Sequence, residues 1–139
     1  MSYHPWRDAR SRKHLEIAFG ESSADCWRGS FSPGRIEVDS RQSQAERRCT
    51  IAHELVHDER RVFPRDPALR AREEVAVERI AARRLVALER LLDVLRWTRH
   101  TDEVADELWV DVPMLVALVR SLTDEERTWI DDQLEAGAA

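Results

Sequence analysis

The sequence has few of the residues that mark secreted or membrane proteins. Its 139 residues include only two cysteines, four glycines and one tyrosine. Two cysteines, Cys26 and Cys49, do not build the disulfide framework typical of a small secreted domain. No apolar run approaches the roughly 18 residues needed to cross a bilayer, and the first residues lack the apolar segment of a signal peptide. We therefore expect a cytoplasmic protein that does not enter a membrane.

Lysine is almost missing, since Lys13 is the single lysine among 22 basic residues and the others are arginine. This bias indicates a GC-rich genome, so we expect an actinobacterial or phage source. The net charge of −5 is also unevenly distributed. Residues 101–139 hold 2 basic and 11 acidic residues, whereas residues 1–100 are mildly basic. The acidity is therefore a property of the C-terminal region.

The length fits one domain, and the order of patterns predicts an α+β fold. Alternating or aromatic-rich stretches at Leu15–Phe19, Cys26–Phe31 and Ile36–Val38 predict three strands, separated by turn residues. We expect them to form a small, mostly antiparallel sheet. The single domain of residues 1–139 would then comprise a β-rich part (1–40), central helices (41–100) and an acidic helical extension (101–139).

Helix starts are well marked. Ser43-Gln-Ala-Glu46 is a capping box that opens a helix to about Glu59, and Asp66-Pro67 begins the next. Further helices are predicted over 88–97 and from Thr101, Val112 and Thr123. These C-terminal helices contain three tryptophans, which we expect to be core or packing residues: Trp97, Trp109 and Trp129.

The most informative motif is His53-Glu54-Leu-Val-His57, an H-E-x-x-H sequence within the first predicted long helix. Side chains four residues apart share a helix face, so His53 and His57 can bind one tetrahedral zinc ion. Glu54 lies beside them and suits a general base for a water molecule whose pKa zinc lowers. The motif therefore predicts metal-assisted amide hydrolysis.

A catalytic zinc ion needs a third protein ligand. Glu74 and Glu78 are four residues apart on the next predicted helix, so one could bind zinc while the other orients a histidine. Glu73 is expected to face solvent and to pair with an arginine of the same helix, namely Arg70, Arg79 or Arg83. Tyr3, Arg48 and His100 could chemically stabilise an oxyanion, but the sequence assigns none of them.

The chain resembles the ImmA/IrrE-type metallo-endopeptidases. The likeness is specific in the run Arg47–His57 and continues through Glu74, Val77-Glu78 and the segment 80–86. It covers roughly residues 4–125, and the segments 4–7 and 34–39 are similar to phage-encoded actinobacterial members. Ile80 replaces the family's usual aromatic residue, and Ala87 occupies a position where many relatives have proline.

The resemblance implies a zincin-like helical core and a set of site residues. His53, His57 and Glu74 would be zinc ligands and Glu54 the catalytic base, while Glu78 would be the alternative ligand or the partner of a ligand. It also implies a protein substrate, a helix-turn-helix transcriptional repressor of a phage or mobile element. A regulatory module that binds a repressor or toxin without cutting it is the alternative.

Residues 104–122 themselves have a helix-turn-helix pattern, but we expect no direct nucleic acid binding. The second helix presents mainly apolar residues and Arg120 as its single basic residue, whereas a base-reading helix needs polar or basic side chains. The local negative charge would repel phosphate. We expect this helix pair to cover the core or to dock a protein partner.

Overall fold

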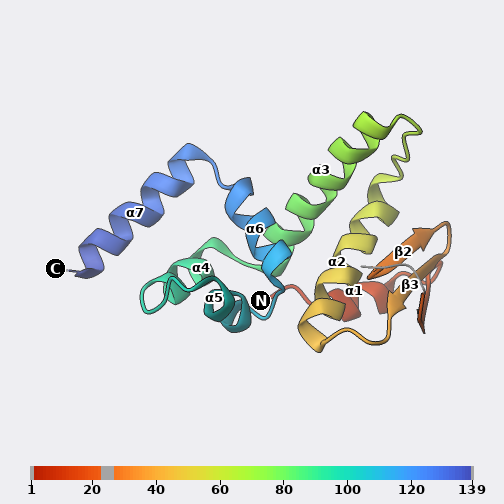
Figure 1. Cartoon of the computed structure of the whole chain (residues 1–139), viewed down its shortest axis with the longest axis horizontal. Helices are drawn as coiled ribbons and strands as arrows, with labels where there is room; N and C mark the ends of the chain where they lie inside the picture. The colour runs from red at the N-terminus through yellow and green to blue at the C-terminus, as the bar shows by residue number, and fades with distance from the viewer. Residues whose placement is uncertain (1, 23–26, 139) are drawn as a thin grey trace.

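The computed structural model describes residues 2–22 and 27–138. In these residues a small sheet is followed by a series of helices (Figure 1). The elements in chain order are α1 (Pro5–Ser11), β1 (Glu16–Gly20), β2 (Gly29–Ser32), β3 (Arg35–Asp39), α2 (Gln44–Arg60), α3 (Pro67–Leu85), α4 (Leu88–Leu95), α5 (Thr101–Leu108), α6 (Val112–Ser121) and α7 (Asp124–Ala138). The α+β prediction is confirmed.

The sheet is mixed, which corrects the mostly antiparallel prediction. Its strand order is β1-β3-β2, with β1 parallel and β2 antiparallel to β3. A short turn with Gly34 at φ 82° joins β2 and β3, and this local signal favours an antiparallel pair. The pairing of β1 with β3 is non-local, and strand patterns carry no information about it. Cys26, expected to start the second strand, lies outside the described residues.

Helix α2 is buried on two sides. Ile51 and Leu55 pack with the sheet residues Ile36 and Val38 in one apolar cluster. On another side, three residues join a larger cluster with α3 and the C-terminal helices, namely Cys49, Ala52 and Val56. The sheet and α3 therefore flank α2, as Figure 1 shows, and the remaining face of α2 is available for the two histidines.

Gly29 allows β2 to lie close to α2. A Cβ atom at this position would lie 2.6 Å from the carbonyl oxygen of Glu37 and 2.6 Å from Cγ2 of Thr50. Both contacts are shorter than real side chains tolerate, so only glycine fits. The glycine thus brings an edge strand directly beside the helix that carries the H-E-x-x-H motif.

The pair α5 and α6 packs on the core, as expected from its apolar pattern. Met114, Leu115 and Leu118 are buried against the large apolar cluster. Helix α7 extends away from this body in Figure 1, and Ile130 is its buried residue. None of the described helices is both long and apolar enough to span a membrane.

The three C-terminal tryptophans are not core residues, contrary to the prediction. Trp97 and Trp109 are 56% and 57% exposed, and Trp129 is 36% exposed. Trp109 directly follows the end of α5, and Trp97 lies two residues beyond the end of α4, so both are outside the regular helices. Trp129 adjoins the buried Ile130 in α7, so its own side chain faces another direction.

Candidate metal centre and active site

A cleft of about 450 Å³ opens beside α2. Its walls come from β2, α2, the α2–α3 segment, α3 and the start of α6. The lining includes the five residues predicted as metal ligands, catalytic base or partner of a ligand, namely His53, Glu54, His57, Glu74 and Glu78. Residues that are distant in the sequence are thus gathered around the H-E-x-x-H motif.

Three side chains converge at one point of this cleft. The Nε2 atoms of His53 and His57 lie 3.2 Å apart. Glu74 reaches both histidines from α3, with one carboxylate oxygen 2.9 Å from Nε2 of His53 and the other 2.8 Å from Nε2 of His57. One ligand atom from each residue lies within 4.8 Å of the others. The three side chains could therefore hold one metal ion.

The spacing of the three donors suits zinc. Tetrahedral ligands at about 2.0–2.1 Å from zinc lie roughly 3.3 Å from one another. The separations between the two Nε2 atoms and the Glu74 oxygens are between 2.8 and 3.2 Å, so a small outward movement would accommodate the ion. Two imidazoles and one carboxylate are also a donor set found in catalytic zinc sites, which keep a fourth position open.

Glu74 and Glu78 contact different atoms of His53. Glu78 forms a short hydrogen bond with Nδ1 of His53, whereas Glu74 approaches Nε2. A carboxylate on the second ring nitrogen fixes the tautomer and orientation of a metal-binding histidine. Glu74 therefore lies at the same ring nitrogens as a shared metal ion would, whereas Glu78 lies at the opposite ring nitrogen of His53. The buried Nδ1 of His57 has no hydrogen-bond partner among the described residues.

Ion pairing dominates the electrostatics of the histidine–glutamate cluster. Burial alone would lower the pKa of His53, but hydrogen bonds to Glu74 and Glu78 raise that pKa to about 10. Hydrogen bonds with His53 and His57 in turn lower the pKa of the Glu74 carboxyl far below its usual range. Since a metal ligand must offer a free lone pair, binding of a metal would release a proton from His53.

Glu54 is set apart from these pairs. Its side chain is buried at 7% exposure, yet its carboxylate has no hydrogen bond or ion pair with the described residues. Burial raises the pKa of Glu54, although the charges of His53 and His57 oppose this effect. A carboxylate with a raised pKa at the edge of a metal site suits proton transfer near neutral pH.

Glu73 differs from the prediction. It is 8% exposed and therefore buried, and it pairs with Arg60 of α2 at 2.5 Å rather than with an arginine of its own helix. The reason is the packing of α3 on α2, which turns Glu73 toward the end of α2. This ion pair connects the two helices that carry the metal-binding side chains.

The residues considered for oxyanion stabilisation do not line the cleft. Tyr3 donates to Asp8, and Arg48 donates to the main-chain carbonyls of Leu85 and Trp109. His100 is exposed ahead of α5. Each of the three lies outside the set of residues that line the cleft.

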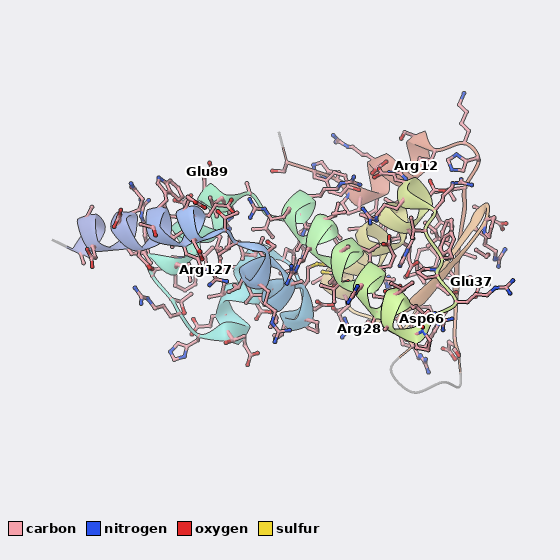
Figure 2. The ribbon with its side chains drawn as sticks, turned by 90° about the horizontal axis from the view of Figure 1, so that it is seen from above. Arg12, Arg28, Glu37, Asp66, Glu89 and Arg127 are labelled. Carbon is pink, nitrogen blue, oxygen red and sulfur yellow. The ribbon has the colours of Figure 1, made fainter. Side chains whose placement is uncertain are left out.

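Several cleft residues were not predicted from the sequence. Arg28 pairs with the N-cap residue of α6, Asp111, at 2.6 Å, and Phe31 and Phe63 line the same cleft. Figure 2 shows Arg28 and Arg12 on opposite sides of α3. Arg12 belongs to a separate group of ion pairs with Asp8, Asp58 and Glu59. Arg28, Phe31 and Phe63 belong to no sequence motif, because only the packing of the chain brings them to the cleft.

The fold and site define a metallopeptidase-type centre, with two histidines and a glutamate at one point and a buried carboxylate beside them. The family model for the M78 peptidases, described as an IrrE N-terminal-like domain, matches residues 14–119. The chain belongs to this family, which confirms the resemblance to ImmA/IrrE-type proteins. No curated protein and no solved structure matches the chain.

Proposed function

We propose that the protein is a zinc-dependent, zincin-like endopeptidase. The observation that carries this proposal is Glu54, a buried carboxylate without a partner among the described residues, beside the cluster of His53, His57 and Glu74. Burying an unpaired carboxylate is costly, and such groups cluster at functional sites. A module that only binds its partner would have no use for that arrangement.

Zinc held by His53, His57 and Glu74 would polarise the scissile carbonyl and lower the pKa of a water molecule. The Glu54 carboxylate takes a proton from the water molecule as the water oxygen attacks the carbonyl carbon. The carbon–nitrogen bond then breaks, and Glu54 delivers the proton to the leaving amine nitrogen. Glu78 keeps the His53 ring in place throughout through its hydrogen bond to Nδ1.

Strand β2 offers a way to hold an extended substrate. It is an edge strand of the sheet and lines the cleft through Gly29, Ser30 and Phe31. The carbonyl of Arg28 accepts a hydrogen bond from Asp39 of β3. In an antiparallel pair, the N–H and C=O groups of every second residue point toward the partner strand. Since those of Arg28 point toward β3, those of Gly29 and Phe31 point away from it. A peptide could pair with them as an added strand.

The substrate class that we propose is a regulatory protein, in particular a helix-turn-helix repressor of a phage or mobile element. Support for this class comes from the family resemblance. Helix α6 presents mainly apolar residues with Arg120 as its one charged residue, and the surrounding C-terminal region is acidic, so this part of the chain does not suit DNA as the binding partner. No direct contact with nucleic acid is needed for the proposed activity.

The test is incubation of the zinc-loaded protein with helix-turn-helix regulators encoded beside it, followed by mass spectrometry. We expect one regulator to yield two fragments. A chelator should stop the cleavage, and added zinc should restore it. Fragmentation that continues after chelation would contradict a metal-dependent mechanism. A stable complex without fragments would instead support the non-cleaving module.

A further inference from the structure

One side of the cleft carries two stacked phenylalanine rings. The ring centroids of Phe31 and Phe63 are 5.6 Å apart, and their planes differ by 9°. Phe63 also stacks on His57, with the centroids 6.1 Å apart and an interplanar angle of 26°. We call Phe31 and Phe63 the aromatic shelf. It forms a continuous surface with the ring of a metal-binding histidine.

The local structure fixes the shelf at this place. Phe31 lies on β2 and packs against the apolar cluster between the sheet and α2. Phe63 follows Arg61, which ends α2 in the left-handed conformation at φ 53°. There the backbone N–H of Arg61 donates to the carbonyl of His57. The chain therefore turns back at the end of α2, and Phe63 comes to lie next to His57.

Phe63 remains 55% exposed despite these contacts. An exposed aromatic ring is common on its own, but this one lies in a cleft and in line with two other rings. Nearby walls of the cleft hold polar and charged groups, including Glu54 and the pair of Arg28 and Asp111. The shelf is thus an apolar surface immediately beside the reacting centre.

The backbone of Phe31 links the shelf to the substrate. Its N–H and C=O point away from β3, toward the position where an extended peptide would pair with β2. A side chain of that peptide would then lie close to the shelf. An anionic side chain would lose hydration on the two phenylalanine rings without gaining a partner, and a cationic one would gain only a weak cation–π contact, whereas a large apolar one would bury surface.

We propose that the aromatic shelf selects a large apolar side chain, aromatic or branched aliphatic, on a substrate residue next to the scissile bond. The proposal rests on the proposed peptidase function and adds the type of residue that the enzyme recognises. Phe63 is the specificity-determining residue, because it contributes the exposed ring. In a hydrophobic pocket a difference of a single methylene group is typically worth about 10–200-fold in discrimination.

Binding of small hydroxamates to the zinc-loaded protein tests the shelf without requiring catalysis. Hydroxamates chelate zinc and can carry either a methyl or a benzyl side chain, placed on the acyl side in one pair and on the nitrogen side in another. By calorimetry we expect at least one benzyl compound to bind about tenfold tighter than its methyl counterpart. Phe63→Ala should remove this preference, which is measured as the ratio of the two affinities within the same variant.

Phe19→Ala is the matched control. Phe19 is 53% exposed and stacks on Trp6, with centroids 5.8 Å apart, but it does not line the cleft. This variant should keep the full benzyl preference. Binding of both compounds with no benzyl preference, or a preference that survives in Phe63→Ala, would overturn the shelf alone. Failure of every hydroxamate to bind would overturn the accessible zinc site on which the proposed function also depends.

Discussion

The two halves of the molecule treat buried polar groups differently. Among the described residues, the part from α1 to α3 buries Asp39, Gln42, Thr50, Glu54, His57, Asp58 and Glu73, whereas the part from α4 to α7 buries only Thr98. The C-terminal half instead buries mainly leucine, valine and methionine and keeps most of its acids at the surface, with Asp111 at the cleft as a largely buried exception. Buried charge is costly, so its concentration in one half indicates where chemistry takes place.

Within the first half, most of the buried acids are neutralised. Asp58 accepts from Arg12 and His14, Glu73 pairs with Arg60, and Asp39 pairs with Arg41. Glu54 differs because it has no such partner in the described part of the chain. The paired acids therefore hold elements of the scaffold together, whereas the carboxylate of Glu54 in the cleft is free of such a pairing with the described residues.

Glu54→Gln removes the one buried acid of the first half that has no partner among the described residues, and it should have the largest effect. We expect the rate of peptide hydrolysis to fall by about 10²–10⁴-fold, because the proton acceptor is lost, while the zinc content stays unchanged. Glu135→Gln makes the same change on the exposed surface of α7 and should alter neither property. Normal turnover in Glu54→Gln would contradict the proposed role.

Leu118→Ala tests the other half. Leu118 is 1% exposed in the apolar cluster, so the cavity should lower the free energy of unfolding by about 2–5 kcal/mol. Val119 is 39% exposed, and Val119→Ala should have a much smaller effect. Urea denaturation measures both. Zinc stoichiometry should remain unchanged in the two variants, and a loss of zinc in either would show that the halves are not separable.

Glu74 and Glu78 are expected to contribute unequally to metal binding, because they contact different ring nitrogens of His53. Loss of a carboxylate that only orients a metal-binding histidine typically weakens metal affinity about 10–100-fold. We therefore expect Glu78→Gln to weaken zinc binding within that range and Glu74→Gln to weaken it further. Competition with a chromophoric chelator gives both constants. The reverse order would make Glu78 the ligand.

Asp58→Asn should show the smallest effect, and it depends on pH. Burial would raise the pKa of Asp58, but hydrogen bonds from His14 and Arg12 outweigh burial and lower it. Because the pKa of Asp58 is lower in the folded state, the ionised carboxylate stabilises the protein at pH values above the unfolded-state pKa of 3.8. This stabilisation is lost as the pH falls below 3.8 and through the folded-state pKa. The substitution should cost about 1–3 kcal/mol at pH 7. This cost should shrink in acid; a constant cost would contradict the ion-pair explanation.

Local signals made part of this fold predictable from the sequence. Ser43 and Glu46 form the expected capping box, and Asp66 caps α3 as predicted. These interactions join residues three positions apart, so a short stretch of sequence contains them. The parallel pairing of β1 with β3 joins residues far apart, and the exposure of Trp97 depends on where α4 ends.

The same distinction applies to the site. His53 and His57 share one helix face at a spacing of four residues, so the motif alone brings them together. The separate positions of Glu74 and Glu78 depend on how α3 packs against α2, which no local pattern specifies. Phe63 belongs to no motif, and the turn after α2 alone brings it to His57.

Elemental analysis of the metal content shows whether His53, His57 and Glu74 hold a metal ion. Elemental mass spectrometry of the purified protein should give about one zinc ion per chain, and His57→Ala should abolish it. His100→Ala removes an exposed histidine of the C-terminal half and should keep the zinc. A wild-type protein that binds no metal, or a His57→Ala variant that retains it, would contradict the account.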